Sequence, residues 1–162
     1  MKCKFRGKRA DNGEWVYGYY RETCGYNCET LHLIHQIELS KCADYLVDSI
    51  TVGQFIGLHD KYGKEIYEGD IVRTQECHNR PYSKNKKGKR HVGVVYYKIS
   101  GGSGFYNRET RKWDIYRDWG AEWAIKINDM GNYCNYSWGL FWNCEVIGNI
   151  HDNPELIERN EK

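Results

Sequence analysis

The chain has 162 residues, which is enough for one sizeable hydrophobic core but short for two domains of ordinary size. Its 24 basic and 22 acidic side chains leave a net charge of +2, so any polyanionic partner would have to be recognised by local clusters of charge. Aromatic residues make up 15% of the chain and there are 17 glycines, a composition that favours pleated sheets and tight turns over helices.

The first residues show the two-residue period of a β-strand. Lys2, Lys4 and Arg6 share one face of this segment, and Cys3 and Phe5 share the other. We therefore predict a strand over residues 2–6 with a basic outer face.

Two more strands are predicted in the first fifty residues. The turn-forming segment 11–14 is followed by an aromatic strand at 15–20, as in a β-hairpin. Residues 31–39 again alternate, which predicts a strand, with a helix as the weaker alternative. We expect residues 1–50 to form an N-terminal β-hairpin region.

Residues 51–72 carry the clearest local signal in the chain. Asp60–Gly63 has the composition of a tight turn and lies between two apolar segments, 55–58 and 66–67. A second bend at Glu68–Gly69 precedes a strand that starts at Asp70. The segment predicts a hairpin followed by a strand.

The second half of the chain alternates short apolar segments with polar or glycine-rich connections. A polar excursion at 75–91 separates the strand at Asp70 from the next one. Further strands are predicted at 92–99, 113–116, 122–127 and 144–150. The order of a capping residue, proline and an acid in residues 152–155 predicts a short helical turn.

These elements predict a mainly β fold. We expect a small SH3-like, barrel-type body of short antiparallel strands, with the N-terminal hairpin region as a subdomain and a helical turn near the C-terminus. We expect one domain over 1–162, with the barrel-like body at 51–157 and a basic polar insertion at 75–91.

Two segments also resemble one known family. The string TVGQFIGLHDKYGKEIYEGDIV at 51–72 and the string EVIGNIHDNPEL at 145–156 are similar to the YopX family of proteins encoded by bacteriophages and prophages. The resemblance implies a mainly β fold, a phage or prophage origin and a location in the cytoplasm of a bacterial host. It supplies no catalytic residues.

The composition also predicts a soluble, cytosolic protein. No apolar run approaches the roughly 18 to 20 residues that a membrane-spanning helix needs, and no apolar core of an export signal follows Met1. The seven cysteines are irregularly spaced, so we expect reduced thiols that are mostly packed as small apolar side chains.

One short window contains metal-ligand residue types. Cys24, Cys28, His32 and His35 form the pattern C-x3-C-x3-H-x2-H. A Cys2His2 zinc finger needs about a dozen residues between its two pairs, and alternation places the two histidines on opposite faces of one strand. The pattern favours a polar loop that enters a strand, and a zinc site is kept as the alternative. We expect no cofactor.

A run of five basic side chains in seven positions ends the polar excursion. Such a run can hold phosphate groups, although a solvated loop tip is the favoured interpretation. If the basic strand face lay beside this run, the two would form one positive surface. The candidate nucleic-acid-binding residues are Lys2, Lys4, Arg6, Lys84, Lys86, Lys87, Lys89 and Arg90.

The sequence shows none of the catalytic motifs that carry a known mechanism. It lacks a P-loop, a nucleophile elbow, an H-E-x-x-H metal site and a dinucleotide-binding fingerprint. We therefore predict a non-enzymatic phage accessory protein that acts by binding, as a homo-oligomer or with a host or phage protein, and without a membrane partner. The alternatives are a nucleic-acid-binding module and a zinc-stabilised protein or metal-dependent enzyme.

Overall fold

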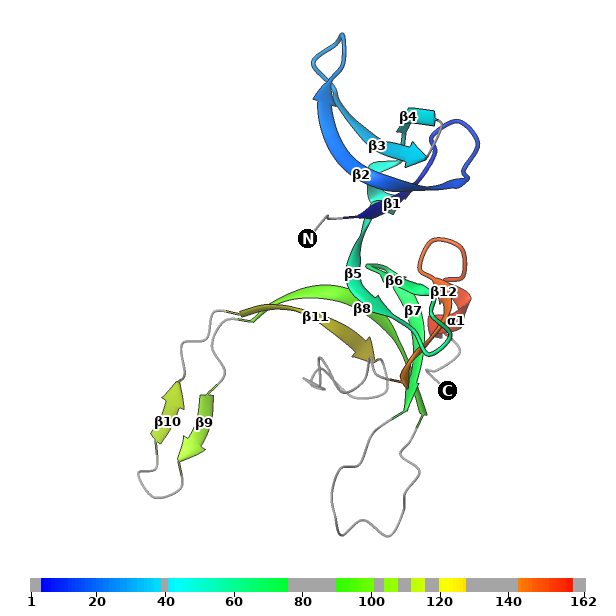
Figure 1. Cartoon of the computed structure of the whole chain (residues 1–162). Helices are drawn as coiled ribbons and strands as arrows, with labels where there is room; N and C mark the ends of the chain where they lie inside the picture. Colours follow the sequence, from blue (N-terminus) through cyan, green and yellow to red (C-terminus); the bar gives the residue numbers. More distant parts are fainter. Residues whose placement is uncertain are drawn as a thin grey trace.

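The structure, a computed structural model, describes residues 4–38, 41–75, 90–100, 104–107, 112–115, 120–127 and 143–158. These residues form antiparallel strands, a 3-10 turn and one short helix (Figure 1). The elements in chain order are β1 Phe5–Lys8, β2 Trp15–Cys24, β3 Thr30–Glu38, β4 Lys41–Leu46, η1 Ser49–Thr51, β5 Gly53–His59, β6 Glu65–Tyr67, β7 Asp70–Gln75, β8 Arg90–Ser100, β9 Gly104–Asn107, β10 Lys112–Ile115, β11 Gly120–Ile127, β12 Glu145–Asn149 and α1 Glu155–Glu158.

The larger sheet has six strands in the order β4-β3-β2-β1-β5-β6. β1 is central because it pairs antiparallel with β2 on one side and with β5 on the other. This pairing attaches the N-terminal strands to the hairpin formed by β5 and β6. In Figure 1 β5 runs from the N-terminal strands towards the second sheet.

The second sheet has four strands in the order β11-β8-β7-β12. β7 leads directly out of the β5–β6 hairpin, and it pairs with β8 on one side and with β12 on the other. β8 and β11 form a long curved ribbon that extends away from β7 (Figure 1). A separate two-stranded ladder joins β9 and β10.

Each half of the fold has its own buried cluster. Val16, Ile34 and Val47 form the centre of the N-terminal cluster. The second cluster gathers side chains of the β5–β6 hairpin and of the four-stranded sheet, and its members are Ile56, Ile66, Val72, Val95, Ile125 and Cys144. The β5–β6 hairpin thus belongs to the larger sheet by its hydrogen bonds and to the second core by its side chains.

The predicted hairpin at 51–72 is confirmed. β5 and β6 flank the turn at Asp60–Gly63, and Gly63 has a φ of 83°, a left-handed conformation that glycine adopts without steric cost. Gly69 has a φ of 79° at the second bend, immediately before β7 begins. The local turn chemistry therefore predicts both bends correctly.

The predicted mainly β fold, built of short antiparallel strands with a C-terminal helical turn, is also confirmed. The strands that the structure describes form open sheets and do not close into a barrel. The division at residue 50 and the assignment of one domain stay predictions. Within the described ranges, no helix is long and apolar enough to cross a bilayer.

Candidate anion-binding site

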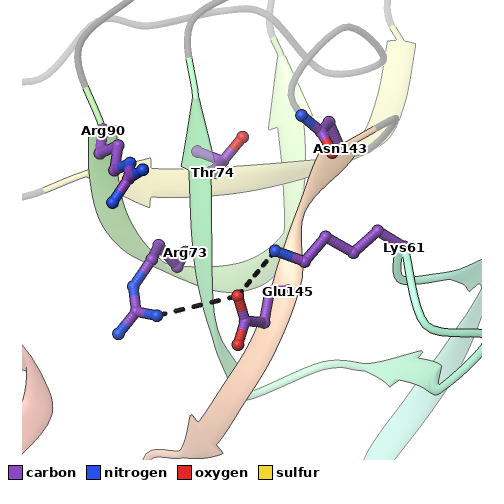
Figure 2. A pocket seen from close by; sticks show the side chains of 6 residues that line it. All are labelled: Lys61, Arg73, Thr74, Arg90, Asn143 and Glu145. Carbon is purple, nitrogen blue, oxygen red and sulfur yellow. Dashed lines mark hydrogen bonds and ion pairs between the residues drawn. The ribbon is translucent and has the colours of Figure 1, made fainter.

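A small open cleft lies on the four-stranded sheet, beside the turn that follows β5 (Figure 2). Its volume is about 160 Å³. The lining side chains are Lys61, Arg73, Thr74, Arg90, Asn143 and Glu145. Three of the six are cations and one is a carboxylate, so the cleft carries a net positive charge.

The strand register explains why these side chains meet. Arg73 on β7 is the direct cross-strand partner of Glu145 on β12. On the other side of β7, Gln75 pairs with Arg90 and Arg73 pairs with Val92, two residues further along β8. Because side chains alternate along a strand, Arg73 and Arg90 share one face of the sheet.

Lys61 comes from a different part of the chain. It is the second residue of the Asp60–Gly63 turn, and its backbone N–H donates to the carbonyl of Cys144, 3.0 Å away, the residue before β12. This hydrogen bond holds the turn against the strand that carries Glu145. Lys61 is thereby brought to the cleft although it is 84 residues from Glu145 in the sequence.

The carboxylate of Asp60 fixes the same turn. Its Oδ1 accepts from the N–H groups of Tyr62 (2.8 Å) and Lys64 (3.0 Å), and its Oδ2 accepts from Val146 N–H (3.1 Å). Burial acts to raise the pKa of Asp60, but the three backbone hydrogen bonds outweigh it and lower that pKa. The ionised carboxylate therefore ties the turn to β12.

One carboxylate oxygen joins two cations of the cleft. Glu145 Oε2 accepts from Lys61 Nζ at 2.9 Å and lies 3.7 Å from Arg73 NH1 (Figure 2). The hydrogen bond from Lys61, supported by the charge of Arg73, lowers the pKa of Glu145. The same hydrogen bond raises the pKa of Lys61. Arg90 forms no ion pair with any residue in the part of the chain that the structure describes.

Comparison with known proteins identifies the family. The model of the YopX protein family matches residues 4–158. The chain belongs to the YopX family. Its structure is similar to the crystal structure of protein EF1440 from Enterococcus faecalis, with a TM-score of 0.45 and 18% sequence identity over 97% of this chain and 99% of that chain. A comparison with curated proteins gave no match.

The cleft contains one of the candidate nucleic-acid-binding residues of this YopX chain. Arg90 is exposed at the first position of β8 and lines the cleft. Lys2, Lys84, Lys86, Lys87 and Lys89 lie outside the described residues. The remaining two candidates, Lys4 and Arg6, lie on β1 and its approach, away from the cleft.

The prediction that Arg6 lies on an exposed basic face is wrong. Arg6 is only 6% exposed, and its guanidinium NH1 lies 2.6 Å from Asp70 Oδ1. The guanidinium also lies over the rings of Trp15 (4.7 Å) and Tyr67 (5.0 Å). Trp15, Tyr67 and Asp70 surround the guanidinium, so Arg6 is a structural residue and does not face a ligand.

Lys4 is also paired within the chain. Its ammonium group donates to both carboxylate oxygens of Glu65 on β6, at 2.8 and 2.6 Å. Lys4 and Arg6 do share one face of the strand, as alternation predicts. Both, however, neutralise acids of the segment 65–70 instead of forming a free positive surface.

The four metal-ligand candidates each have a separate environment. His32 Nδ1 contacts the hydroxyl of Tyr20, and His35 Nδ1 lies 2.7 Å from Asp44 Oδ1. Cys24 and Cys28 are exposed free thiols, so the expectation of packed thiols is wrong for both. No group of three or more potential metal ligands occurs among the residues that the structure describes.

Sequence reasoning did not identify Lys61, Arg73 or Glu145 as site residues. Each is an isolated charge in its own segment, and only the pairing of β7 with β12 and the docking of the β5–β6 turn bring them together. Arg90 could be identified as a candidate from the sequence because it ends the basic run 84–90.

Proposed function

We propose that this YopX-family chain is a non-enzymatic binding protein that holds nucleic acid by its phosphate groups. The observation that supports the proposal is the cationic cleft formed by Lys61, Arg73 and Arg90. Arg90 is also the last residue of the basic run 84–90 in the sequence. Phosphate contacts of this kind supply most of the affinity in binding that does not depend on sequence.

The chemistry of the cleft suits binding better than turnover. Among the described residues that line the cleft, the one carboxylate, Glu145, is ion-paired and its pKa is lowered, which makes it a weak general base near neutral pH. The remaining lining groups are cations, a hydroxyl and an amide, all of which can donate hydrogen bonds to phosphate oxygens. This set can hold an anion.

The proposal is tested by fluorescence anisotropy with labelled single-stranded DNA, duplex DNA and RNA at several salt concentrations. We expect binding that weakens linearly on a log–log plot of affinity against salt, with a slope of about −0.7 to −0.9 per phosphate contacted. Replacing Lys84, Lys86, Lys87 and Lys89 with Gln should weaken binding and flatten this slope. An unchanged slope would show that the basic run does not contact phosphates. The absence of binding at low salt would reject the proposed function.

Self-association is a second candidate, and one face of the larger sheet favours it. Tyr17 on β2 and Leu46 on β4 are 41% and 45% exposed, and the strand register places them on the same face. Exposed apolar side chains on one sheet face are typical of interfaces between protein copies. Light scattering coupled to gel filtration tests this candidate. Monomers at all concentrations would reject it.

The origin and location of the protein also belong to the proposal. We propose that it is a phage or prophage accessory protein that acts in the cytoplasm of a bacterial host. The same binding assay with host-cell proteins in place of nucleic acid tests whether the partner is instead a host or phage protein.

A further inference from the structure

We infer that the Glu145 carboxylate is an internal competitor in the cleft, which holds the place of one phosphate group until a ligand displaces it. This inference rests on the proposed function and adds a regulated site to it. The ligand chemistry is a single phosphate group, either within a nucleic acid strand or free in solution.

The geometry places the carboxylate where an anionic ligand would bind. Glu145 Oε2 contacts cations from two different elements, with 2.9 Å to Lys61 Nζ and 3.7 Å to Arg73 NH1. Figure 2 shows the carboxylate between these two side chains. A phosphate oxygen at this position would meet the same two donors.

The size of the cleft limits what can bind there. Its volume of about 160 Å³ lies below the roughly 300–1,000 Å³ of pockets that enclose drug-sized ligands. One phosphate group fits this space, and the remainder of a ligand would stay outside. Phosphate also offers more charge and more acceptor oxygens than a carboxylate, and an arginine can bind it through two parallel hydrogen bonds.

The exposure of the pairs makes displacement feasible. The side chains of Glu145, Lys61 and Arg73 are 27%, 35% and 48% exposed, so water already screens their attraction. Such partly exposed ion pairs are weak, and opening them costs little. The buried Arg6–Asp70 pair, at 7% and 1%, has no such access to solvent and could not exchange its partner in this way.

Arg90 supplies the attraction that would draw the phosphate in. It lines the cleft, has no ion-pair partner among the described residues, and lies on the face of the sheet that carries Arg73. A phosphate in the cleft would therefore gain Arg90 in addition to the two cations that Glu145 releases. Glu145 would lower the affinity for phosphate without abolishing it.

The inference is tested by titrating inorganic phosphate into the wild-type chain and two variants, with binding followed by NMR of the backbone amides of residues 73–74 and 90–91. Glu145→Gln removes the competing charge and frees Lys61 and Arg73. Glu65→Gln is the control, because it removes a carboxylate that is ion-paired with Lys4 on the other sheet and makes the same change in net charge.

We expect Glu145→Gln to bind phosphate about three- to tenfold more tightly than the wild type, and Glu65→Gln to change affinity less than twofold. Equal effects of the two variants would overturn the inference, because net charge alone would then explain them. If Glu145→Gln does not fold, the wild type still decides the question. Saturating phosphate should then raise the pKa of the Glu145 carboxyl towards its ordinary value. This pKa is measured from the NMR chemical shift of the Glu145 carboxyl carbon as the pH is varied. An unchanged pKa would contradict the inference.

A parallel titration with a labelled oligonucleotide separates this inference from the proposed function. Nucleic acid binding that is unaffected by both inorganic phosphate and Glu145→Gln would support the proposed function and contradict the role of Glu145 as a competitor. If Glu145→Gln binds phosphate more tightly and Glu65→Gln does not, but the protein binds no nucleic acid, the role of Glu145 as a competitor is supported and the proposed function is rejected. The ligand would then be a free phosphate.

Discussion

Arg6 and Asp70 form a nearly buried ion pair that joins β1 to the start of β7. Their side chains are 7% and 1% exposed, and the Arg6 NH1 to Asp70 Oδ1 distance is 2.6 Å. Asp70 Oδ2 also accepts the backbone N–H of Tyr67 at 2.8 Å, and Arg6 NH2 donates to the carbonyl of Glu68 at 3.2 Å. The pair therefore connects the first strand to the bend from which the four-stranded sheet begins.

Replacing Asp70 with Ala should strongly destabilise the protein. The change leaves the Arg6 guanidinium buried without its counter-charge, which typically costs about 3–5 kcal/mol of unfolding free energy. Urea denaturation measures this loss. Asp44→Ala is the control, because Asp44 pairs with Arg21 and His35 at the surface, and its loss should cost less than about 1 kcal/mol. Similar losses in both variants would show that the pair is not held in a low-dielectric interior.

The turn that presents Lys61 should depend on Asp60. In Asp60→Ala three backbone N–H groups lose their acceptor, and we expect a loss of roughly 2–4 kcal/mol in unfolding free energy. Asp11→Ala, at an exposed turn, should have little effect. If Asp60→Ala keeps its stability in chemical denaturation, water must replace the carboxylate and the turn does not need it.

The sequence predicts the parts of this fold that depend on local chemistry. The bends at Gly63 and Gly69 follow from glycine and neighbouring acids, and alternation predicts β1 and β3. The turn at 11–14 and the aromatic residues after it predict β2. The alternation of apolar and polar residues does not show which face of a strand is buried. Among the β3 residues whose burial is described, Ile34 is fully buried, whereas Leu31 and Leu33 on the more apolar face are only partly buried.

The candidate site was less accessible to sequence reasoning than the fold. Arg90 stands in a recognisable basic run, but Lys61, Arg73 and Glu145 are single charges whose meeting depends on strand pairing between distant segments. Arg6 is the opposite case, because the sequence marks it as a candidate site residue and the structure does not. Its position in a basic alternating segment predicts an exposed side chain, and only the packing of Trp15 and Tyr67 from other elements reveals that Arg6 is covered.

Gly93 is required for close contact between β8 and β11. A Cβ at this position would lie 2.6 Å from both Ile125 Cγ2 and the Lys126 carbonyl oxygen. Gly93→Ala should therefore lower the unfolding free energy by about 1–3 kcal/mol and speed hydrogen exchange along β11. Gly63→Ala, where a Cβ meets nothing within 4 Å but φ is 83°, should cost about 1 kcal/mol and leave β11 protected. Unchanged exchange along β11 in Gly93→Ala would contradict the steric argument.

Asp152 should make part of the stability depend on pH. Hydrogen bonds from Asn149, Lys8 and Trp15 lower the pKa of Asp152 from 3.8 to about 2. A carboxyl group whose pKa is lower in the folded state contributes stability that is fully present above its unfolded pKa. This contribution is lost as the pH falls from about 4 through 2.

The comparison of wild type with Asp152→Asn isolates that contribution. The wild type should be more stable at pH 6, by no more than about 1 kcal/mol because Asp152 is partly exposed. The difference should shrink between pH 4 and pH 2.5 in urea denaturation. A constant difference over this range would show that the pKa of Asp152 is not lowered by its partners.

The most direct test of the proposed phosphate-binding cleft compares Arg73→Gln with Arg21→Gln in anisotropy titrations with single-stranded DNA. Both variants remove one exposed arginine that is paired with a carboxylate, but only Arg73 lines the cleft. We predict that Arg73→Gln weakens binding by about tenfold and reduces the magnitude of the salt slope by about 0.7, whereas Arg21→Gln behaves like the wild type. Equal affinities and slopes for the two variants would contradict the assignment of the cleft as the binding site.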